Sequence, residues 1–420
     1  TYSFRGIDNS IYYMMDRTGR HYKNYSGCGN TMNSNHPVVR SFIMNCLRYW
    51  VLHMHVDGFR FDLASILTRD KNGDILPNPP IVEGIAEDPA LRGTKIIAEA
   101  WDAAGAYQVG EFPSQHWSEW NGRYRDDVRR FWKGERGLLG AFATRISGSA
   151  DLYHKDSQTP LKSINFVTCH DGFTLRDLVS YHQKHNDRNN EGNRDGENHN
   201  HSMNFGHEGP TDDPRIEAQR IKQQKNFLAT LFLSQGVPMM LAGDEMSHTQ
   251  DGNNNAYCQD NELSWINWAR CDRNQDLLHF TRDLIRLRKR HPSLRRQSFF
   301  TGRRDGSAEA DIQWFGPEGG EPDWTQGLRL CAWISGNHVH TGHVEDCPDL
   351  LLVFNADEHP CDFRLPKAPG SPWTVETYTT TQTPTWRHQH HVIETEARSV
   401  IVLSSNRLTF AEPPSALILP

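Results

Sequence analysis

The sequence predicts an α/β domain with a parallel sheet, followed by a smaller antiparallel β-sandwich. Continuously apolar strands that alternate with helices predict the parallel sheet. From about residue 299 the chain instead has short strands joined by Pro- and Gly-rich turns, with no long helix between them, which predicts the sandwich. At 420 residues the chain is long enough for both domains.

The first domain should contain three long helices and at least four strands. Apolar residues recur at three- and four-residue spacing over 37–54, and Pro37 suits the first turn of a helix there. The other helices are expected over 216–235 and 275–290. Strands are expected within 55–65, 95–102, 164–173 and 236–245, with a weaker candidate near 119–132.

The second domain should contain four clear strands, over 328–336, 349–357, 373–380 and 397–405. We place the boundary near residues 292–300. The expected organisation is therefore the parallel α/β domain over 1–295, the sandwich over 296–405 and a tail over 406–420.

Composition and charge exclude several classes of protein. A net charge of -7 without a basic stripe argues against nucleic-acid binding. No apolar run approaches the ~20 residues that span a bilayer. The eight cysteines form no CxxC pair and follow no regular spacing, which suits a reduced, cytosol-like compartment without a disulfide framework.

The strand within HVDGFRFDLAS (55–65) ends in charged residues. Arg60 and Asp62 are two residues apart and should project from the same face, whereas Asp57 alternates away from Asp62. For one isolated strand, a structural ion pair would explain this. Two more apolar strands, however, end at Glu99 and at Asp171.

The carboxyl ends of the strands in a parallel α/β barrel meet on one face, where active sites form. Three carboxylates on one face raise one another's pKa and are costly unless they act on something. Glycoside hydrolysis needs such a set. One carboxylate attacks the anomeric carbon and another, kept protonated, gives its proton to the leaving oxygen.

The same strand ends resemble three of the four conserved regions of the α-amylase superfamily, glycoside hydrolase family 13: GFRFDLAS, IIAEAWD and NFVTCHD. Further segments are similar to its isoamylase and glycogen-debranching branch: YSGCGNTMNSNHPVV (25–39), EWNGRYRDDVRRFWKG (119–134), KHNDRNNEGNRDGENHNHSMNFGHEGPTDD (184–213), GNNNAYCQDNELSW (252–265) and DIQWFGPEGGEPDW (311–324).

The resemblance implies a TIM-type (β/α)8 barrel followed by the sandwich. The family's first conserved region and strands one to three are not found, nor is the N-terminal sandwich usual in this branch. We therefore expect a partial barrel, with about strands four to eight, from the C-terminal portion of a longer enzyme.

The resemblance also implies catalytic roles. Asp62 would be the nucleophile, Glu99 the general acid/base and Asp171 the stabiliser of the transition state. Arg60 would orient Asp62 and keep it ionised, and His170 would hydrogen-bond the sugar beside the cleaved bond. The expected outcome is retention at the anomeric carbon, with the first two carboxyls about 5–5.5 Å apart.

Other residues beside the expected strand ends are candidates for glucose subsites. Aromatic faces stack on sugar rings, although ordinary core packing explains each aromatic residue equally well. Asp102 could hold a sugar hydroxyl or cap a helix, and Asp244 is expected to shape the pocket floor without doing chemistry. The aromatic candidates are Trp101, Tyr107, Trp120 and Tyr257.

Five histidines crowd one polar loop, at positions 182, 185, 199, 201 and 207. A zinc site is one interpretation, but the spacing matches no standard ligand motif and Asn and Gly dominate the segment. We favour a long ordered loop that walls the substrate cleft. No metal and no cofactor are expected.

The predicted function is hydrolysis of α-1,6-glucosidic branch points in glycogen, amylopectin or limit dextrins, without nucleic-acid or membrane partners. The three carboxylates are shared across the superfamily, so an α-1,4-acting hydrolase or transglycosylase is an alternative. A non-catalytic glucan-binding or regulatory subunit and an inactive truncated fragment are others. The expected location is the cytoplasm, or the plastid stroma in a plant or alga.

Overall fold

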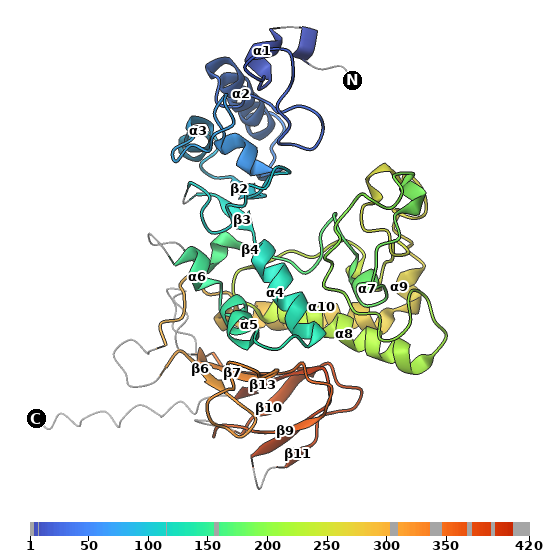
Figure 1. The fold of residues 1–420 in the computed structure, drawn as a ribbon. Coiled ribbons are helices and arrows are strands. Elements are labelled where there is room, and N and C mark those ends of the chain that lie inside the picture. The colour runs from blue at the N-terminus through green and yellow to red at the C-terminus, as the bar shows by residue number, and fades with distance from the viewer. Residues whose placement is uncertain are drawn as a thin grey trace, which may run out of the picture. The chain divides into compact units, whose positions relative to one another are not determined.

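The computed structural model describes residues 4–6, 8–114, 116–154, 159–302, 310–336, 347–367, 372–387 and 391–405 (Figure 1). The chain forms two compact units. Unit 1 comprises Thr1–Arg123 and Ser149–Asn165, and unit 2 comprises Tyr124–Gly148 and Phe166–Pro420. Within the described ranges, no helix is both long and apolar enough to cross a membrane.

Unit 1 is built around four parallel strands in the order β1-β2-β3-β4. Gly58 begins the first strand, and a Cβ there would lie 2.4 Å from the carbonyl oxygen of Lys95 on the second, so only glycine fits. The strands are β1 (Gly58–Phe61), β2 (Lys95–Ala98), β3 (Ser118–Trp120) and β4 (Ser163–Asn165). The helices of this unit are α1 (Asn9–Tyr12), α2 (Pro37–Leu52), α3 (Pro80–Glu87) and α6 (Ala150–Tyr153).

Helix α2 confirms the helix expected over 37–54. Pro37 occupies its first turn, and the His36 ring accepts a hydrogen bond from the Val38 amide. The helix buries Val39, Met44 and Leu47.

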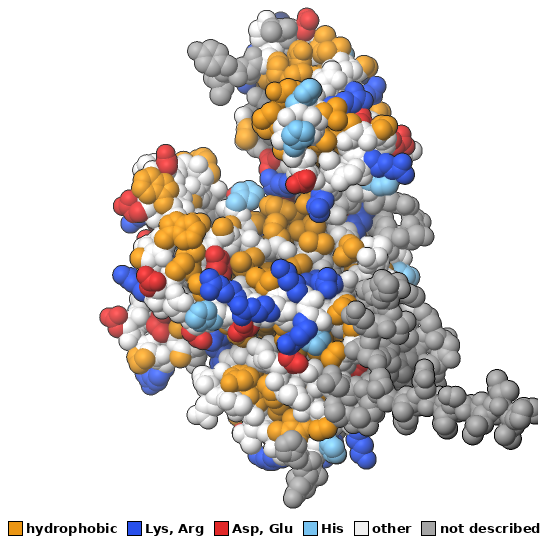
Figure 2. All heavy atoms as spheres, turned by 180° about the vertical axis from the view of Figure 1, so that it is seen from behind, with side chains coloured by type: hydrophobic (Ala, Val, Ile, Leu, Met, Phe, Trp, Pro, Cys, Tyr) orange, Lys and Arg blue, Asp and Glu red, His pale blue; other side chains and the backbone are white. Residues whose placement is uncertain are grey.

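Trp50, near the end of α2, is 48% exposed. Together with Cys46 and Phe59 it lines an apolar groove of about 480 Å³ beside β1. Hydrophobic side chains are prominent on the surface of unit 1 (Figure 2). Among the described strands of unit 1, β1 pairs only with β2, so its other edge presents unpaired backbone groups.

Helix α4 (Gly122–Lys133) corrects one expectation. The weak strand candidate near 119–132 is wrong beyond Trp120, where β3 ends. Tyr124, Val128 and Phe131 are fully buried and recur at three- and four-residue spacing, which is the period of a helix and not of a strand.

Unit 2 contains the helices expected over 216–235 and 275–290. Helix α8 begins at Pro214, after Asp213 accepts a hydrogen bond from the Arg215 amide, and its second half is buried. The strands expected over 164–173 and 236–245 are shorter than predicted and end at Asn165 and Pro238. The elements of this part are α5 (Leu139–Ile146), α7 (Leu175–Leu178), α8 (Pro214–Leu233), β5 (Val237–Pro238), α9 (Arg270–Arg273) and α10 (Gln275–Arg290).

The predicted antiparallel sandwich is confirmed. One sheet has the order β10-β13-β8-β7-β6, and the other has the order β11-β12-β9. The strands are β6 (Ile312–Phe315), β7 (Arg329–Ile334), β8 (Asp349–Asn355), β9 (Cys361–Arg364), β10 (Thr374–Tyr378), β11 (Trp386–Arg387), β12 (Val392–Thr395) and β13 (Ser399–Ser405). The boundary expected near residues 292–300 stays a prediction, and the expected tail lies outside the described residues.

Strand β8 is buried along its whole length because both of its faces are covered. Leu350, Leu352 and Phe354 join the core that includes the helices of unit 2. Leu351 and Val353 join the core between the two sheets of the sandwich. A continuously apolar strand therefore occurs in an antiparallel sheet here, since helices cover the face that would otherwise meet water.

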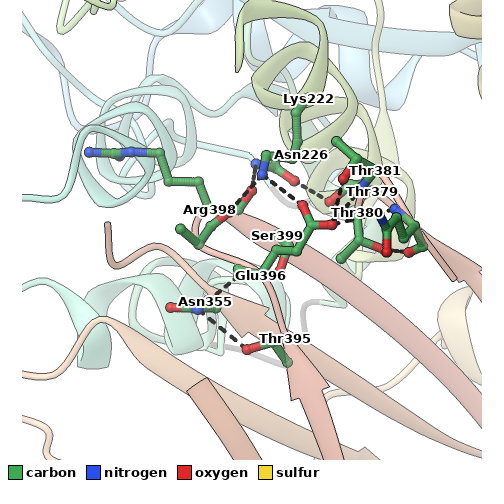
Figure 3. A network of polar contacts seen from close by, with 12 residues as sticks. Lys222, Asn226, Asn355, Thr379, Thr380, Thr381, Thr395, Glu396, Arg398 and Ser399 are labelled. Carbon is green, nitrogen blue, oxygen red and sulfur yellow. Dashed lines mark hydrogen bonds and ion pairs between the residues drawn. The ribbon is translucent and has the colours of Figure 1, made fainter. Parts of the chain in front are cut away.

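Helix α8 is joined to the sandwich by a network of polar contacts (Figure 3). The Lys222 ammonium pairs with Glu396 at 3.0 Å, and Thr381 donates to the same carboxylate. Asn226 donates to the Arg398 carbonyl oxygen at 2.9 Å. Partial burial alone would raise the pKa of Glu396, but the Thr381 hydrogen bond and the Lys222 charge outweigh it and lower that pKa.

All eight cysteines are free in the structure, and three of them, at positions 28, 46 and 258, are exposed.

Candidate active site

Arg60 lies between two carboxylates at the carboxyl ends of β1 and β2. Its Nη1 is 2.9 Å from Asp62 Oδ1, and its Nη2 is 2.6 Å from Glu99 Oε2. The parallel register pairs Phe61 with Ala98, so the residues that follow the two strands emerge side by side. The prediction that Arg60 and Asp62 share a face is confirmed.

The two carboxylates have different environments. The Asp62 side chain is 73% exposed, whereas that of Glu99 is 6% exposed and also accepts a hydrogen bond from the Leu63 amide at 2.8 Å. Leu63 adopts φ 41°, a left-handed conformation that is costly for a leucine. That conformation belongs to the turn that brings the Leu63 amide to Glu99. Different environments allow two carboxylates to take different protonation roles.

Trp120, on β3, supports the arginine. It is 7% exposed, and the Arg60 guanidinium carbon lies 4.2 Å from the centre of its ring. This cation–π contact helps to fix the position of the Arg60 guanidinium group. A sugar could stack on the same ring face only if Arg60 moved, and the role of Trp120 as a glucose subsite stays a prediction.

The loop after β2 carries three more predicted residues. Trp101 and Tyr107 pair through an isolated antiparallel β-bridge, and their rings stack with their centres 6.1 Å apart. Tyr107 is 47% exposed. Asp102 is buried, pairs with Arg69 at 2.7 Å and accepts hydrogen bonds from the Ala104 and Ala106 amides. Asp102 therefore shapes the loop that presents the aromatic pair.

Unit 2 carries His170 and Asp171 on a turn that follows β4 along the chain. Their side chains are 53% and 65% exposed, and His170 Nε2 lies 3.4 Å from Asp171 Oδ2. The convergence of Asp171 with Asp62 and Glu99 stays a prediction, because the third carboxylate belongs to the other unit.

Asp244 is a buried carboxyl group that anchors the start of this turn. It accepts hydrogen bonds from the Thr168 hydroxyl and, at 2.9 Å, from the Leu175 amide. Burial raises its pKa to about 7, although both hydrogen bonds act in the opposite direction.

Tyr257 and the histidine-rich loop also belong to unit 2. Tyr257 is 68% exposed, and its hydroxyl donates to Glu191. Glu208 contacts two of these histidines, since it accepts hydrogen bonds from the His182 amide and from the His185 ring. Among the residues that the structure describes, no three His, Cys, Asp or Glu side chains are grouped to hold a metal ion.

Sequence reasoning missed a set of buried asparagines in the same region of unit 2. Asn186, Asn189, Asn200, Asn253 and Asn254 are all less than a tenth exposed. The signal was available, since asparagines are dense in 184–213 and run consecutively over 253–255. Their partners lie on separate loops, so the sequence alone did not connect them.

This fold and these residues define a partial α/β barrel that carries acidic side chains just beyond its strand ends. The chain belongs to the alpha-amylase family, because residues 13–292 match the model of the alpha amylase catalytic domain. The family predicted from the sequence is thereby confirmed.

The similar curated proteins belong to the predicted branch of the family. The chain is 49% identical over 394 residues to the "Glycogen operon protein GlgX homolog" of Mycobacterium tuberculosis, covering 90% of this chain and 54% of that protein. It is 46% identical over 391 residues to "Isoamylase 1, chloroplastic" of Oryza sativa subsp. japonica, covering 88% and 47%. It is 46% identical over 364 residues to the "Glycogen debranching enzyme" of Pectobacterium carotovorum, covering 86% and 52%. The chain thus spans about half the length of the curated relatives it matches.

Solved structures confirm the predicted fold. Pullulanase type I from Bacillus subtilis, complexed with maltose, matches with a TM-score of 0.70 at 21% identity, covering 97% of this chain and 51% of that one. A pullulanase mutant from Paenibacillus barengoltzii, complexed with maltotriose, matches with a TM-score of 0.70 at 22% identity, covering 96% and 56%.

Proposed function

We propose that this chain is the catalytic part of a glycosidase that hydrolyses α-1,6 branch linkages in glycogen or amylopectin-like glucans, with retention at the anomeric carbon. The observation that carries the proposal is the single arginine, Arg60, that contacts an exposed Asp62 and a buried Glu99. A pair of carboxylates with unequal environments is what the two roles of a retaining glycosidase require.

In the proposed first step, Asp62 attacks the anomeric carbon and Glu99 gives a proton to the leaving oxygen. The solvent-facing position of Asp62 leaves it open to substrate, and Arg60 orients it. A separation of about 5–5.5 Å between the two carboxyls belongs to this mechanism and is part of the proposal.

In the second step Arg60 faces one charged carboxylate in place of two. Once Asp62 is esterified it carries no charge, so the positive charge of Arg60 acts on Glu99 alone, across their 2.6 Å contact. A neighbouring positive charge favours the carboxylate form of an acid. Glu99, already a carboxylate after the first step, would then take a proton from water as that water attacks the anomeric carbon, and the bond between this carbon and Asp62 would break. Both carboxyl groups return to their starting forms.

His170 and Asp171 would bind hydroxyl groups of the sugar at the cleaved bond, with Asp171 stabilising the transition state. The stacked pair of Trp101 and Tyr107 and the exposed Tyr257 would contact neighbouring glucose units. Asp102 would act through the loop that it holds.

Branched α-glucans, including limit dextrins, are the proposed substrates, since similar proteins carry the names isoamylase and glycogen debranching enzyme. Eight free cysteines fit a reduced compartment, and we propose the cytoplasm, or the plastid stroma in a plant or alga.

Chain profiling tests the proposed bond specificity. The chain is incubated with amylopectin and separately with amylose, and the released chains are measured. Short linear chains from amylopectin alone are expected. Products from amylose would favour an α-1,4-acting enzyme, and no products from either glucan would overturn the proposal for this chain.

Two variants of β1 and its flanks control the assay. Asp62→Asn should abolish covalent-intermediate formation while glucan binding persists. Asp57→Asn changes an exposed carboxylate that immediately precedes β1, and it should leave the product profile unchanged. Equal losses in both variants would count against the assigned nucleophile.

A further inference from the structure

The carboxylate of Asp171 is not held in place by packing, because its side chain is 65% exposed. Its position therefore depends on the backbone of the turn that carries it. Gly172, the next residue, has φ +86°, which favours glycine. The Gly172 amide donates to the carbonyl oxygen of Asn254 at 2.9 Å, and this bond fixes the exit of the turn.

Asn254 is buried, with 1% of its surface exposed, and both polar atoms of its side chain make hydrogen bonds that fix it in place. Its Oδ1 accepts from Asn186 at 2.9 Å, and its Nδ2 donates to the Glu197 carbonyl oxygen at 2.7 Å and to Asn200 Oδ1 at 2.9 Å. The Asn254 backbone amide donates to Asn186 Oδ1 at 2.9 Å, so the two asparagines bond reciprocally. Both amide donors of Asn254 are therefore used, and its side-chain oxygen has a partner as well.

The contacts of Asn254 continue to the entrance of the same turn. Arg129 donates to the Asn200 carbonyl oxygen at 3.2 Å and to the Val167 carbonyl oxygen at 2.8 Å. The turn that carries Asp171 runs from Val167 to Gly172. Arg129 links its start, and Asn254 links its end, to the loop over residues 186–200, which we call the asparagine-rich loop.

A second set of amides makes that loop rigid. Asn253 donates to Asn189 Oδ1 at 2.9 Å, and Asn189 donates to Asp195 Oδ2 at 2.7 Å. Asn255 donates to the same oxygen of Asp195 at 2.9 Å. Neighbouring residues of 253–255 thus face different partners, and a shift of one would break bonds made by the others.

We propose that Asn254 is a positioning residue for Asp171, and that the asparagine-rich loop acts in catalysis by fixing the turn that carries this carboxylate. The inference rests on the proposed role of Asp171 in glycoside hydrolysis. Active-site groups must be held to within a fraction of an ångström, and residues outside the site do this through hydrogen bonds.

Asn254→Asp is the sharpest substitution, because it keeps the shape of the side chain and removes both amide donors. A carboxylate oxygen would then face the Glu197 and Asn200 oxygens and repel them. A displacement of the turn by about 1 Å would lower kcat by roughly 10²-fold, while KM changes little because Asp171 acts mainly in the transition state. Backbone amide exchange at Gly172 should become faster, since its acceptor moves.

The sandwich offers a matched control, Asn355→Asp. Asn355 is also fully buried, and it donates to the His359 and Glu396 carbonyl oxygens at 3.0 and 2.9 Å. This substitution removes the same number of donors, so it should lower Tm without changing kcat or the exchange of Gly172.

Asn186→Asp tests the same hydrogen bonds if Asn254→Asp fails to fold. It removes the donor to Asn254 Oδ1 and should reproduce the loss of kcat and the faster exchange. The effects of the two substitutions should be far from additive, because the residues act as one unit.

Two readouts separate this inference from the proposed function. Loss of kcat and faster Gly172 exchange in both loop variants, with neither in Asn355→Asp, would support it. Unchanged exchange in the loop variants, or an equal fall of kcat in the control, would overturn it. If the unsubstituted chain releases no products, the proposed function fails, and Gly172 exchange alone decides whether Asn254 fixes the turn.

Discussion

Arg60 lies closer to Glu99, at 2.6 Å, than to Asp62, at 2.9 Å, although Asp62 is its near neighbour in the sequence. Arg60, a residue of β1, therefore links the carboxyl ends of β1 and β2. A guanidinium can do this because its donors form a planar fork, with separate nitrogens for separate partners. An ammonium group is a single point and cannot hold both carboxylates in the same geometry.

Arg60→Lys should therefore impair catalysis even though it keeps the charge. We expect kcat to fall by roughly 10²-fold, with the larger effect on hydrolysis of the glycosyl-enzyme, because an ammonium group cannot hold the Glu99 carboxylate in place as the base and orient Asp62 at the same time. Rapid-quench measurements should show a burst of product followed by slow turnover. Arg92→Lys, at an exposed arginine in the same unit, is the control. Near-normal turnover by Arg60→Lys would contradict the bridging role.

Glu99→Gln should be sensitive to the leaving group of the substrate. A glutamine cannot donate a proton to the glycosidic oxygen, and a natural glucan needs that proton far more than an activated aryl glycoside does. We expect the first step to be slowed by about 10²–10⁴-fold on glucan and much less on the aryl glycoside. The measurement is pre-steady-state kinetics on both substrates. Equal losses on the two would argue against the acid role.

The sequence predicted the local half of this site and missed the half that depends on register and on loops. Arg60 and Asp62 share a face by strand periodicity alone. The contact between Arg60 and Glu99 instead needs the pairing of Phe61 with Ala98, which no local pattern encodes. The Asn254 network was missed for the same reason, since its amides bond across loops far apart in the chain.

The fold was predicted more fully than the site, and its errors have local causes. The helices α2, α8 and α10 and the sandwich strands were predicted because the spacing of their apolar residues reflects which faces of the helix or strand are buried. The segment beyond Trp120 was misassigned because strand β3 is followed after a single residue by helix α4, so one short polar segment contains parts of both elements. The strand expected over 164–173 ends at Asn165, and the Thr168 hydroxyl beyond it donates to Asp244, a contact that hydrophobic periodicity does not encode.

Asp244 should make the stability of unit 2 fall as the pH rises. Its folded-state pKa is about 7, raised by burial from the ordinary aspartate value of 3.8. Between about pH 4 and pH 7 the unfolded chain therefore releases this proton while the folded chain keeps it, and the free energy of unfolding decreases. Asp244→Asn should flatten this part of the profile. Thermal unfolding measured from pH 4 to pH 8 tests the prediction.

Thr168→Val provides the contrast for Asp244. The Thr168 hydroxyl donates to Asp244 and holds its pKa down, so removing that donor should raise the pKa further. The loss of stability should then extend to higher pH, in the direction opposite to that of Asp244→Asn. Parallel profiles for both variants and the unsubstituted chain would show that Asp244 does not titrate in this range.

Glu396 should affect stability with the opposite dependence on pH. Its folded-state pKa lies below the ordinary glutamate value of 4.5, because hydrogen bonding to Thr381 and pairing with Lys222 outweigh partial burial, which alone would raise it (Figure 3). The resulting stabilisation is present above about pH 4.5 and is lost as the pH falls through the lower folded-state pKa. Glu396→Gln should therefore lower Tm at pH 7, and the difference in Tm from the unsubstituted chain should narrow towards pH 3.

Glu358→Gln is the matched control for Glu396→Gln, because Glu358 is 74% exposed in its pair with Arg398 and such pairs contribute little to stability. A deficit in Glu396→Gln that stays constant from pH 7 to pH 3 would mean that the network of Figure 3 acts through packing and not through the charge of this carboxylate.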